Sequence, residues 1–117
     1  MIKSYQKNQI QIIELNRPKV NAIDDSLISS LNIELDKIER NDSIKGLILT
    51  GQSGVFSAGL DIVSLYNKDK EYMENFWLMF SSLLLRIYRY PKLVFSAISD
   101  HSPAGGTVIS IMTDYRV

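Results

Sequence analysis

Runs of apolar residues and stretches of periodic apolar residues follow one another along the chain. Residues Ile10–Leu15 form a short β-branched run, and residues 45–51 and 92–98 are nearly continuous apolar runs, so each predicts a strand. A glycine-started helix is predicted at 104–112, and a further strand opens at 114–117. With the helices between the strands, this order predicts an α/β fold with mostly parallel strands.

Two stretches between these strands carry apolar residues at every third or fourth position, the spacing of one helix face. The first helix follows Asp24 or Asp25, either of which can cap it, and ends near Asn41. Its stripe consists of Leu27, Leu31, Leu35 and Ile38. The second helix ends at Pro91, because proline cannot continue a helix. Its stripe consists of Phe76, Phe80, Leu83, Leu84 and Ile87.

Composition narrows the possible functions. The 117 residues, with no linker, repeat or low-complexity segment, predict that residues 1–117 form one domain or a piece of a larger one. Thirteen basic and thirteen acidic residues give no net charge, which argues against nucleic acid or an anionic membrane surface as a partner. The chain has no cysteine and only one histidine, His101, so we expect no metal site built on thiolates or paired imidazoles.

Two glycine-containing stretches stand out, "GVFSAGLD" at 54–61 and "HSPAGGTVIS" at 101–110. Each follows a predicted buried strand, at a point where small residues allow a sharp turn and close approach of a ligand. The first N–H groups of a helix lack internal partners and carry partial positive charge. Two such loops on neighbouring strands could therefore form an oxyanion hole, or both could simply be tight turns. Neither has the G-x-G-x-x-G or Walker A spacing.

Three segments resemble the crotonase, or enoyl-CoA hydratase/isomerase, superfamily. They are "ELNRPKVNAI", "LILTGQSGVFSAGLDI" and "SAISDHSPAGGTVISIMTDYRV". The resemblance implies a crotonase-like spiral of repeated ββα units, of which these residues correspond to roughly the N-terminal half. In the full-length family it implies a homotrimer.

Within that family, "FSAGLDI", "WLMFSSLLLRIY" and "SPAGG" are similar to the mitochondrial Δ3,Δ2-enoyl-CoA isomerases. These enzymes move a double bond of an unsaturated acyl-CoA during fatty acid β-oxidation. The resemblance therefore implies an acyl-CoA thioester as the substrate and the mitochondrial matrix as the location. It implies no cofactor, because coenzyme A is part of the substrate.

The resemblance also assigns site residues. The main-chain N–H groups of Leu60 and Gly105 would hold the thioester oxygen while an enolate-like charge develops on it. The residues that would meet the substrate and its coenzyme A are Lys19, Val20, Ala22, Ala58 and Asp61. In this assignment the carbonyl of Ala58 contacts the adenine amino group.

The catalytic base is the open part of this assignment. Val108 stands where hydratases of the family have a glutamate, and valine cannot transfer a proton, so isomerisation is favoured over hydration. The isomerases' glutamate lies beyond the segment that resembles "DYRV", so we expect residues 1–117 alone not to isomerise. Asp61 and His101 are weaker alternatives as base, and Asp100 replaces the family's usual glycine. The other two hypotheses are a non-catalytic acyl-CoA-binding or assembly protein and an enoyl-CoA hydratase.

Overall fold

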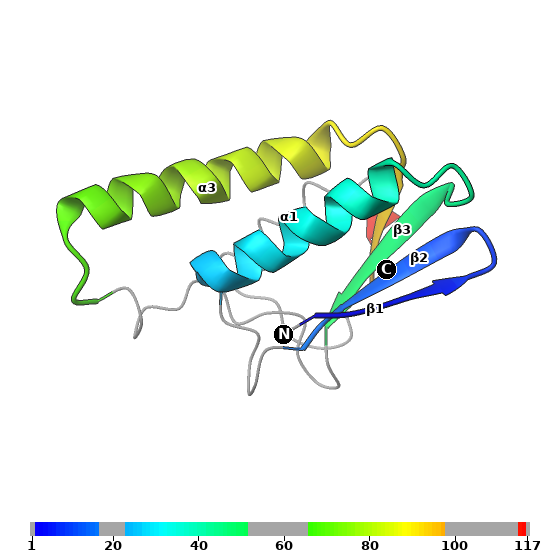
Figure 1. Ribbon diagram of the computed structural model, residues 1–117, viewed down its shortest axis with the longest axis horizontal. Coiled ribbons are helices and arrows are strands. Elements are labelled where there is room, and N and C mark those ends of the chain that lie inside the picture. Colours follow the sequence, from blue (N-terminus) through cyan, green and yellow to red (C-terminus); the bar gives the residue numbers. More distant parts are fainter. Residues whose placement is uncertain (1, 17–22, 52–65, 98–114, 117) are drawn as a thin grey trace.

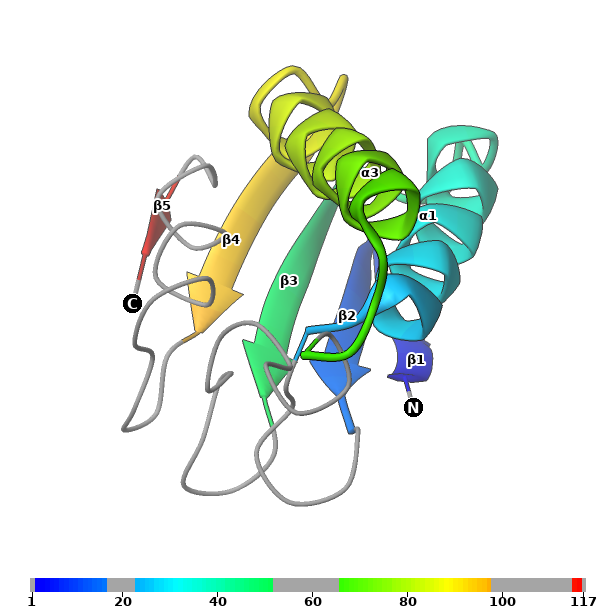
Figure 2. The same cartoon turned by 90° about the vertical axis from the view of Figure 1, so that its left-hand side faces the viewer.

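The computed structural model describes residues 2–16, 23–51, 66–97 and 115–116. In this part of the chain one twisted sheet carries two long helices on the same face (Figures 1 and 2). The elements are β1 (Ile2–Lys7), β2 (Ile10–Leu15), α1 (Asp25–Glu39), β3 (Gly46–Gly51), α3 (Lys70–Tyr88), β4 (Leu93–Ala97) and β5 (Tyr115–Arg116). The predicted α/β class is confirmed.

The five strands lie in the order β1-β2-β3-β4-β5. Strands β2 to β5 are parallel to one another, as predicted. Strand β1 is the exception, since it forms an antiparallel hairpin with β2. Asn8 in the connecting turn has φ 57°, a left-handed conformation that asparagine adopts more readily than most residues. Strand β1 is not predicted from the sequence, because most of its positions are exposed and the strand therefore lacks an apolar run.

Both predicted helices are present, and each begins with an aspartate cap. The Asp24 carboxylate accepts a hydrogen bond from the Leu27 N–H at 2.9 Å, and the Asp69 carboxylate accepts one from the Tyr72 N–H at 2.8 Å. Such a bond satisfies one of the N–H groups that a helix start leaves free. Helix α1 has its predicted bounds, whereas α3 begins at Lys70, ahead of the apolar stripe that predicted it.

Replacing Asp24 by alanine tests the first of these caps. The expected result is a loss of about 1 kcal/mol in the free energy of unfolding, because the Leu27 N–H loses its acceptor. Urea titration followed by circular dichroism measures it. Asp24→Asn is the matched control, since asparagine keeps an acceptor oxygen and should restore most of the loss. An alanine variant as stable as the parent chain would show that the cap contributes little.

The core lies between the sheet and the two helices. Every second residue of the central strands is buried there: Ile13 and Leu15 of β2, Leu47 and Leu49 of β3, Val94 and Ser96 of β4. The helices cover them with the stripes predicted from the sequence, except that Leu84 is only partly buried. This packing fixes both helices against the sheet and so fixes where each helix begins.

Candidate active site

The carboxyl ends of β2, β3 and β4 lie side by side at one edge of the sheet (Figure 2). Leu15 at the end of β2 is level with Gly51 at the end of β3, and Thr50 is level with Ala97 at the end of β4. Neighbouring strands are about 4.8 Å apart, so the three ends fall within roughly 10 Å. In open α/β sheets this edge is where ligands bind.

Each of the three segments that carry the predicted site residues follows one of these strand ends in the sequence. Segment 17–22 follows β2, segment 52–65 follows β3, and segment 98–114 follows β4. The predicted residues Lys19, Val20, Ala22, Ala58, Leu60, Asp61 and Gly105 all lie outside the described residues, as do Asp100, His101 and Val108. Their convergence on one thioester oxygen therefore stays a prediction, whereas the juxtaposition of the strands that precede them is observed.

Helix α1 begins near this edge and runs back along the sheet from it, whereas α3 begins farther from the strand ends (Figures 1 and 2). Their first turns are joined by a hydrogen bond from the Tyr72 hydroxyl to the Asp25 carboxylate at 2.7 Å. This bond is the main reason that the pKa of Tyr72 is raised, with desolvation and the charges of Asp25 and Asp24 adding to it. The ammonium of Lys68 lies 5.0 Å from the centre of the Tyr72 ring.

The bond between Tyr72 and Asp25 links the helix that follows segment 17–22 to the helix that follows segment 52–65. The sequence alone does not reveal this bond, because Asp25 fits the role of a helix cap. A pairing between residues 47 positions apart leaves no local signal in one sequence. The contact holds the first turns of the two helices together.

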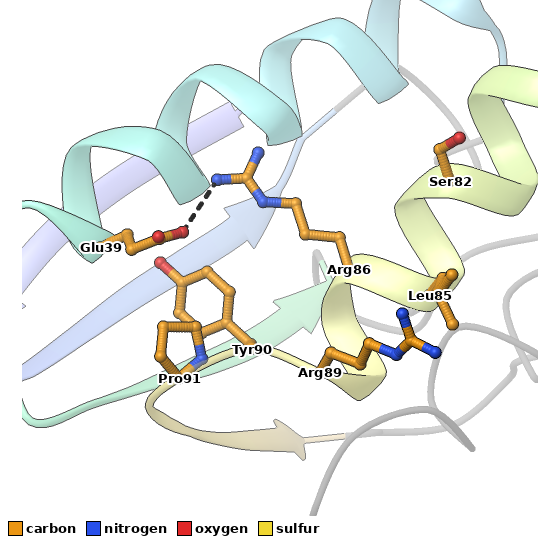
Figure 3. Close-up of a pocket in the computed structure, with 7 residues that line it drawn as sticks. All are labelled: Glu39, Ser82, Leu85, Arg86, Arg89, Tyr90 and Pro91. Carbon is orange, nitrogen blue, oxygen red and sulfur yellow. Dashed lines mark hydrogen bonds and ion pairs between the residues drawn. The ribbon is translucent and has the colours of Figure 1, made fainter.

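A hollow of about 380 Å³ lies at the opposite end of the molecule, where α3 leads into β4 (Figure 3). It is lined by Glu39, Ser82, Leu85, Arg86, Arg89, Tyr90 and Pro91. The Arg86 guanidinium is bound to Asp36 at 2.6 Å and to Glu39 at 3.3 Å, and it also reaches Asn32. These contacts tie α3 to α1, so this part of the hollow is structural and is remote from the strand ends above.

Among the described residues, no group of three or more His, Asp or Glu side chains lies close enough together to hold a metal ion. None of the helices in this part of the chain is both long enough and apolar enough to cross a membrane.

Residues 5–117 match the protein family described as Enoyl-CoA hydratase/isomerase. The chain belongs to this family. The predicted family and the predicted crotonase-type fold are therefore both confirmed.

The relatives of this chain include proteins named isomerases and proteins named hydratases. The Mus musculus protein "Enoyl-CoA delta isomerase 1, mitochondrial" is 36% identical over 109 residues, which are 92% of this chain and 38% of that protein. The Pongo abelii protein "Enoyl-CoA hydratase, mitochondrial" is 32% identical over 117 residues, 96% of this chain and 38% of that protein. The crystal structure of human mitochondrial delta3-delta2-enoyl-CoA isomerase matches with a TM-score of 0.93 and 30% identity, covering 98% of this chain and 46% of that one.

The chain thus spans 38% of the length of these curated relatives and less than half of the solved structure. Family membership covers nearly the whole chain, whereas more than half of each of these relatives has no counterpart in the match.

Proposed function

We propose that this chain supplies the substrate-holding half of a Δ3,Δ2-enoyl-CoA isomerase of fatty acid metabolism. The observation that carries the proposal is the alignment of three parallel strand ends at one edge, each followed in sequence by a segment with predicted site residues. An acyl-CoA thioester bound at that edge would meet all three segments at once.

In this proposal the main-chain N–H groups of Leu60 and Gly105 donate hydrogen bonds to the thioester oxygen. When a base removes the proton from C2, negative charge moves onto that oxygen, and the two donors stabilise it. One such donor is worth about 2.7–4 kcal/mol of transition-state stabilisation. The proton then returns to C4, which completes the shift of the double bond from position 3 to position 2.

Isomerisation is preferred to hydration because of Val108. Water addition needs two carboxylates, and valine at this position cannot serve as one of them. The identity of 36% to an isomerase, against 32% to a hydratase, points in the same direction. An enoyl-CoA hydratase is thus the less favoured candidate.

The base is expected on a segment beyond the one resembling "DYRV", so residues 1–117 by themselves should bind a CoA thioester without turning it over. A mitochondrial location and a trimeric full-length assembly complete the proposal. The names of the isomerase relatives, which are mitochondrial, support the location.

Incubation of purified residues 1–117 with a 3-enoyl-CoA tests the proposal, with formation of the conjugated thioester followed by absorbance. We expect micromolar to millimolar binding, measured by calorimetry, and no turnover above background. A chain with no affinity for the thioester would overturn the proposed function.

Turnover would instead mean that the base has been misplaced, and two variants locate it. Asp61→Asn and His101→Gln remove the alternative bases in segments 52–65 and 98–114. Asp42→Asn is the matched control, because it removes an exposed carboxylate near the amino end of β3, away from the proposed site. Activity lost in either of the first two variants but kept in the control would assign the base to that residue.

A further inference from the structure

Helix α3 has a second apolar face, which is turned toward solvent. Trp77 and Leu85 are 47% and 48% exposed, and Leu78 and Tyr88 are each 67% exposed. Another face of the same helix carries the buried stripe that packs against the sheet and α1. No described element lies over the outer face (Figures 1 and 2). Apolar residues on both faces are typical of a helix that is buried all round, whereas α3 is covered on one face only.

The exposed apolar residues of α3 form a row, unlike those elsewhere in the described residues. The other large apolar side chains that are exposed there lie singly on different segments of the chain: Tyr5, Ile33, Tyr66 and Leu93. Single exposed apolar residues are normal on a protein surface, but a contiguous row marks a surface that another element covers.

Two shallow hollows on this face meet at Ser81, the small residue near the middle of the row. The hollow beside Trp77 and Leu78 has a volume of about 400 Å³, and the hollow beside Leu85 and Tyr88 has a volume of about 460 Å³. One helix packs on another by placing its ridges in such grooves, and a small side chain lets the two backbones approach closely. An extended segment fits less well, because its backbone N–H and C=O groups would face apolar side chains without partners.

Charged residues near the two ends of the row add a direction to this surface. Arg89, at the carboxyl end of α3, forms no ion pair with a described residue. Figure 3 shows its side chain turned away from Arg86 and Glu39. Glu74, near the amino end, has only a 4.0 Å contact with the exposed Lys70. A helix with an acidic residue toward Arg89 and a basic residue toward Glu74 would complement both charges.

The comparison with the human isomerase structure indicates what covers this face. The match extends over 98% of this chain with a TM-score of 0.93, but over only 46% of that chain. More than half of that chain therefore lies outside the match, and a part of that size needs apolar surface to pack on. The row on α3 is such a surface. A second copy of this chain is a poorer occupant, because a two-fold contact between α3 helices does not close the trimer proposed for the full-length assembly.

We propose that the outer face of α3 is the docking surface for an amphipathic helix from the half of the crotonase fold that this chain does not match. That helix crosses α3 at Ser81 and fills the two hollows with large apolar side chains. The surface is the same whether that half continues this chain or is a separate polypeptide. The proposal concerns assembly, so it does not depend on the isomerase chemistry proposed above.

Trp77 reports directly on this surface, because it is the only tryptophan of the chain and lies in the row. The chain is labelled with 5-fluorotryptophan and refolded together with a probe, the polypeptide that follows the matched residues in the Mus musculus isomerase relative. We expect the fluorine resonance of Trp77 to shift and to saturate at an equimolar ratio, with micromolar or tighter affinity. An unchanged resonance, or a shift that depends only on the concentration of the chain itself, overturns the proposal.

Two variants of the row test whether the contact lies on this face. Leu78→Asp places a charge in one hollow, and Ser81→Arg blocks the close approach of a helix. Each should raise the dissociation constant at least about tenfold and leave the circular dichroism spectrum of the chain unchanged. Ile33→Asp is the matched control, since Ile33 is exposed on α1 and its replacement should change the constant less than about twofold. Equal effects of Leu78→Asp and Ile33→Asp would place the contact elsewhere and so overturn the proposal.

Turnover of a 3-enoyl-CoA by the complex tests the proposed function separately. A complex that forms with the expected response of Trp77 but does not isomerise the substrate supports the docking surface and counts against the isomerase assignment. Isomerisation by a complex that Leu78→Asp forms as tightly as the parent chain supports that assignment and overturns the docking surface.

Discussion

Replacing Phe76 by alanine should lower the free energy of unfolding by about 3–5 kcal/mol, the usual cost of removing a buried phenylalanine. Phe76 is 1% exposed, on the inner face of α3. The centre of its ring lies 6.2 Å from that of Phe80 in a stacked arrangement and 5.9 Å from that of Trp77 in a T-shaped, edge-to-face arrangement. The variant therefore loses aromatic contacts and leaves a cavity between the sheet and the helix.

Urea titration followed by circular dichroism measures this loss. Ile33→Ala is the matched control, because it also removes a large apolar side chain from a helix, but from a position that is 54% exposed on α1. Its effect should stay within about 0.5 kcal/mol of zero. If the two variants unfold at the same urea concentration, Phe76 is not the core residue that its burial indicates.

The central strands and the inner helix faces could be predicted from the sequence because burial imposes a period. Apolar residues in α1 recur at helical spacing, and β3 reads as one apolar run, so the position of each element follows from which residues avoid water. The predicted and observed bounds of a helix agree best where a capping residue or a proline marks its end. Asp24 before α1 and Pro91 after α3 are both in this class.

The first strand and the first turn of α3 could not be predicted in this way. Most of β1 is exposed, so its pairing with β2 comes from backbone hydrogen bonds that any residue can make. Residues 70–75 precede the first fully buried residue of α3, and among them Tyr72 and Met73 pack against the core while only partly buried. Asp69, which caps that turn, was the available signal.

At the candidate site, the sequence predicts which segments matter, and the fold places the strands that precede them side by side. Parallel strands bring their carboxyl ends to one edge, although these strands are far apart in the chain. The bond between Tyr72 and Asp25 had no such signal, since it depends on how the two helices pack on the sheet. Family resemblance, rather than periodicity, supplied the roles of Leu60 and Gly105.

Tyr90→Phe should change how stability depends on pH. Tyr90 is 8% exposed, and its hydroxyl donates a hydrogen bond to the Leu35 carbonyl at 2.6 Å (Figure 3 shows the ring beside Glu39). Burial raises the pKa of Tyr90 to about 12; the charges of Glu39 and Asp36 add to this, and that of Arg86 opposes it. At neutral pH the variant should lose about 1 kcal/mol of unfolding free energy with this hydrogen bond.

Above pH 10 the parent chain should lose this advantage. The unfolded chain releases the Tyr90 proton near its ordinary pKa of 10, whereas the folded chain holds the proton up to about pH 12. The free energy of unfolding of the parent chain is therefore unaffected by this group below pH 10 and falls by up to about 3 kcal/mol as the pH rises from 10 to 12, more than the hydrogen bond contributes at neutral pH. Phenylalanine does not titrate, so the stability curves of parent and variant should cross near about pH 11.

Thermal or urea unfolding at intervals between pH 7 and pH 12 locates this crossing. Tyr66→Phe is the control, since Tyr66 is 80% exposed and removing its hydroxyl should leave the curve parallel to that of the parent. Parallel curves for Tyr90→Phe as well would mean that the buried phenol releases its proton as easily as one in water. The hydrogen bond from Tyr90 to Leu35 would then add no stability to the packing of α3 against α1.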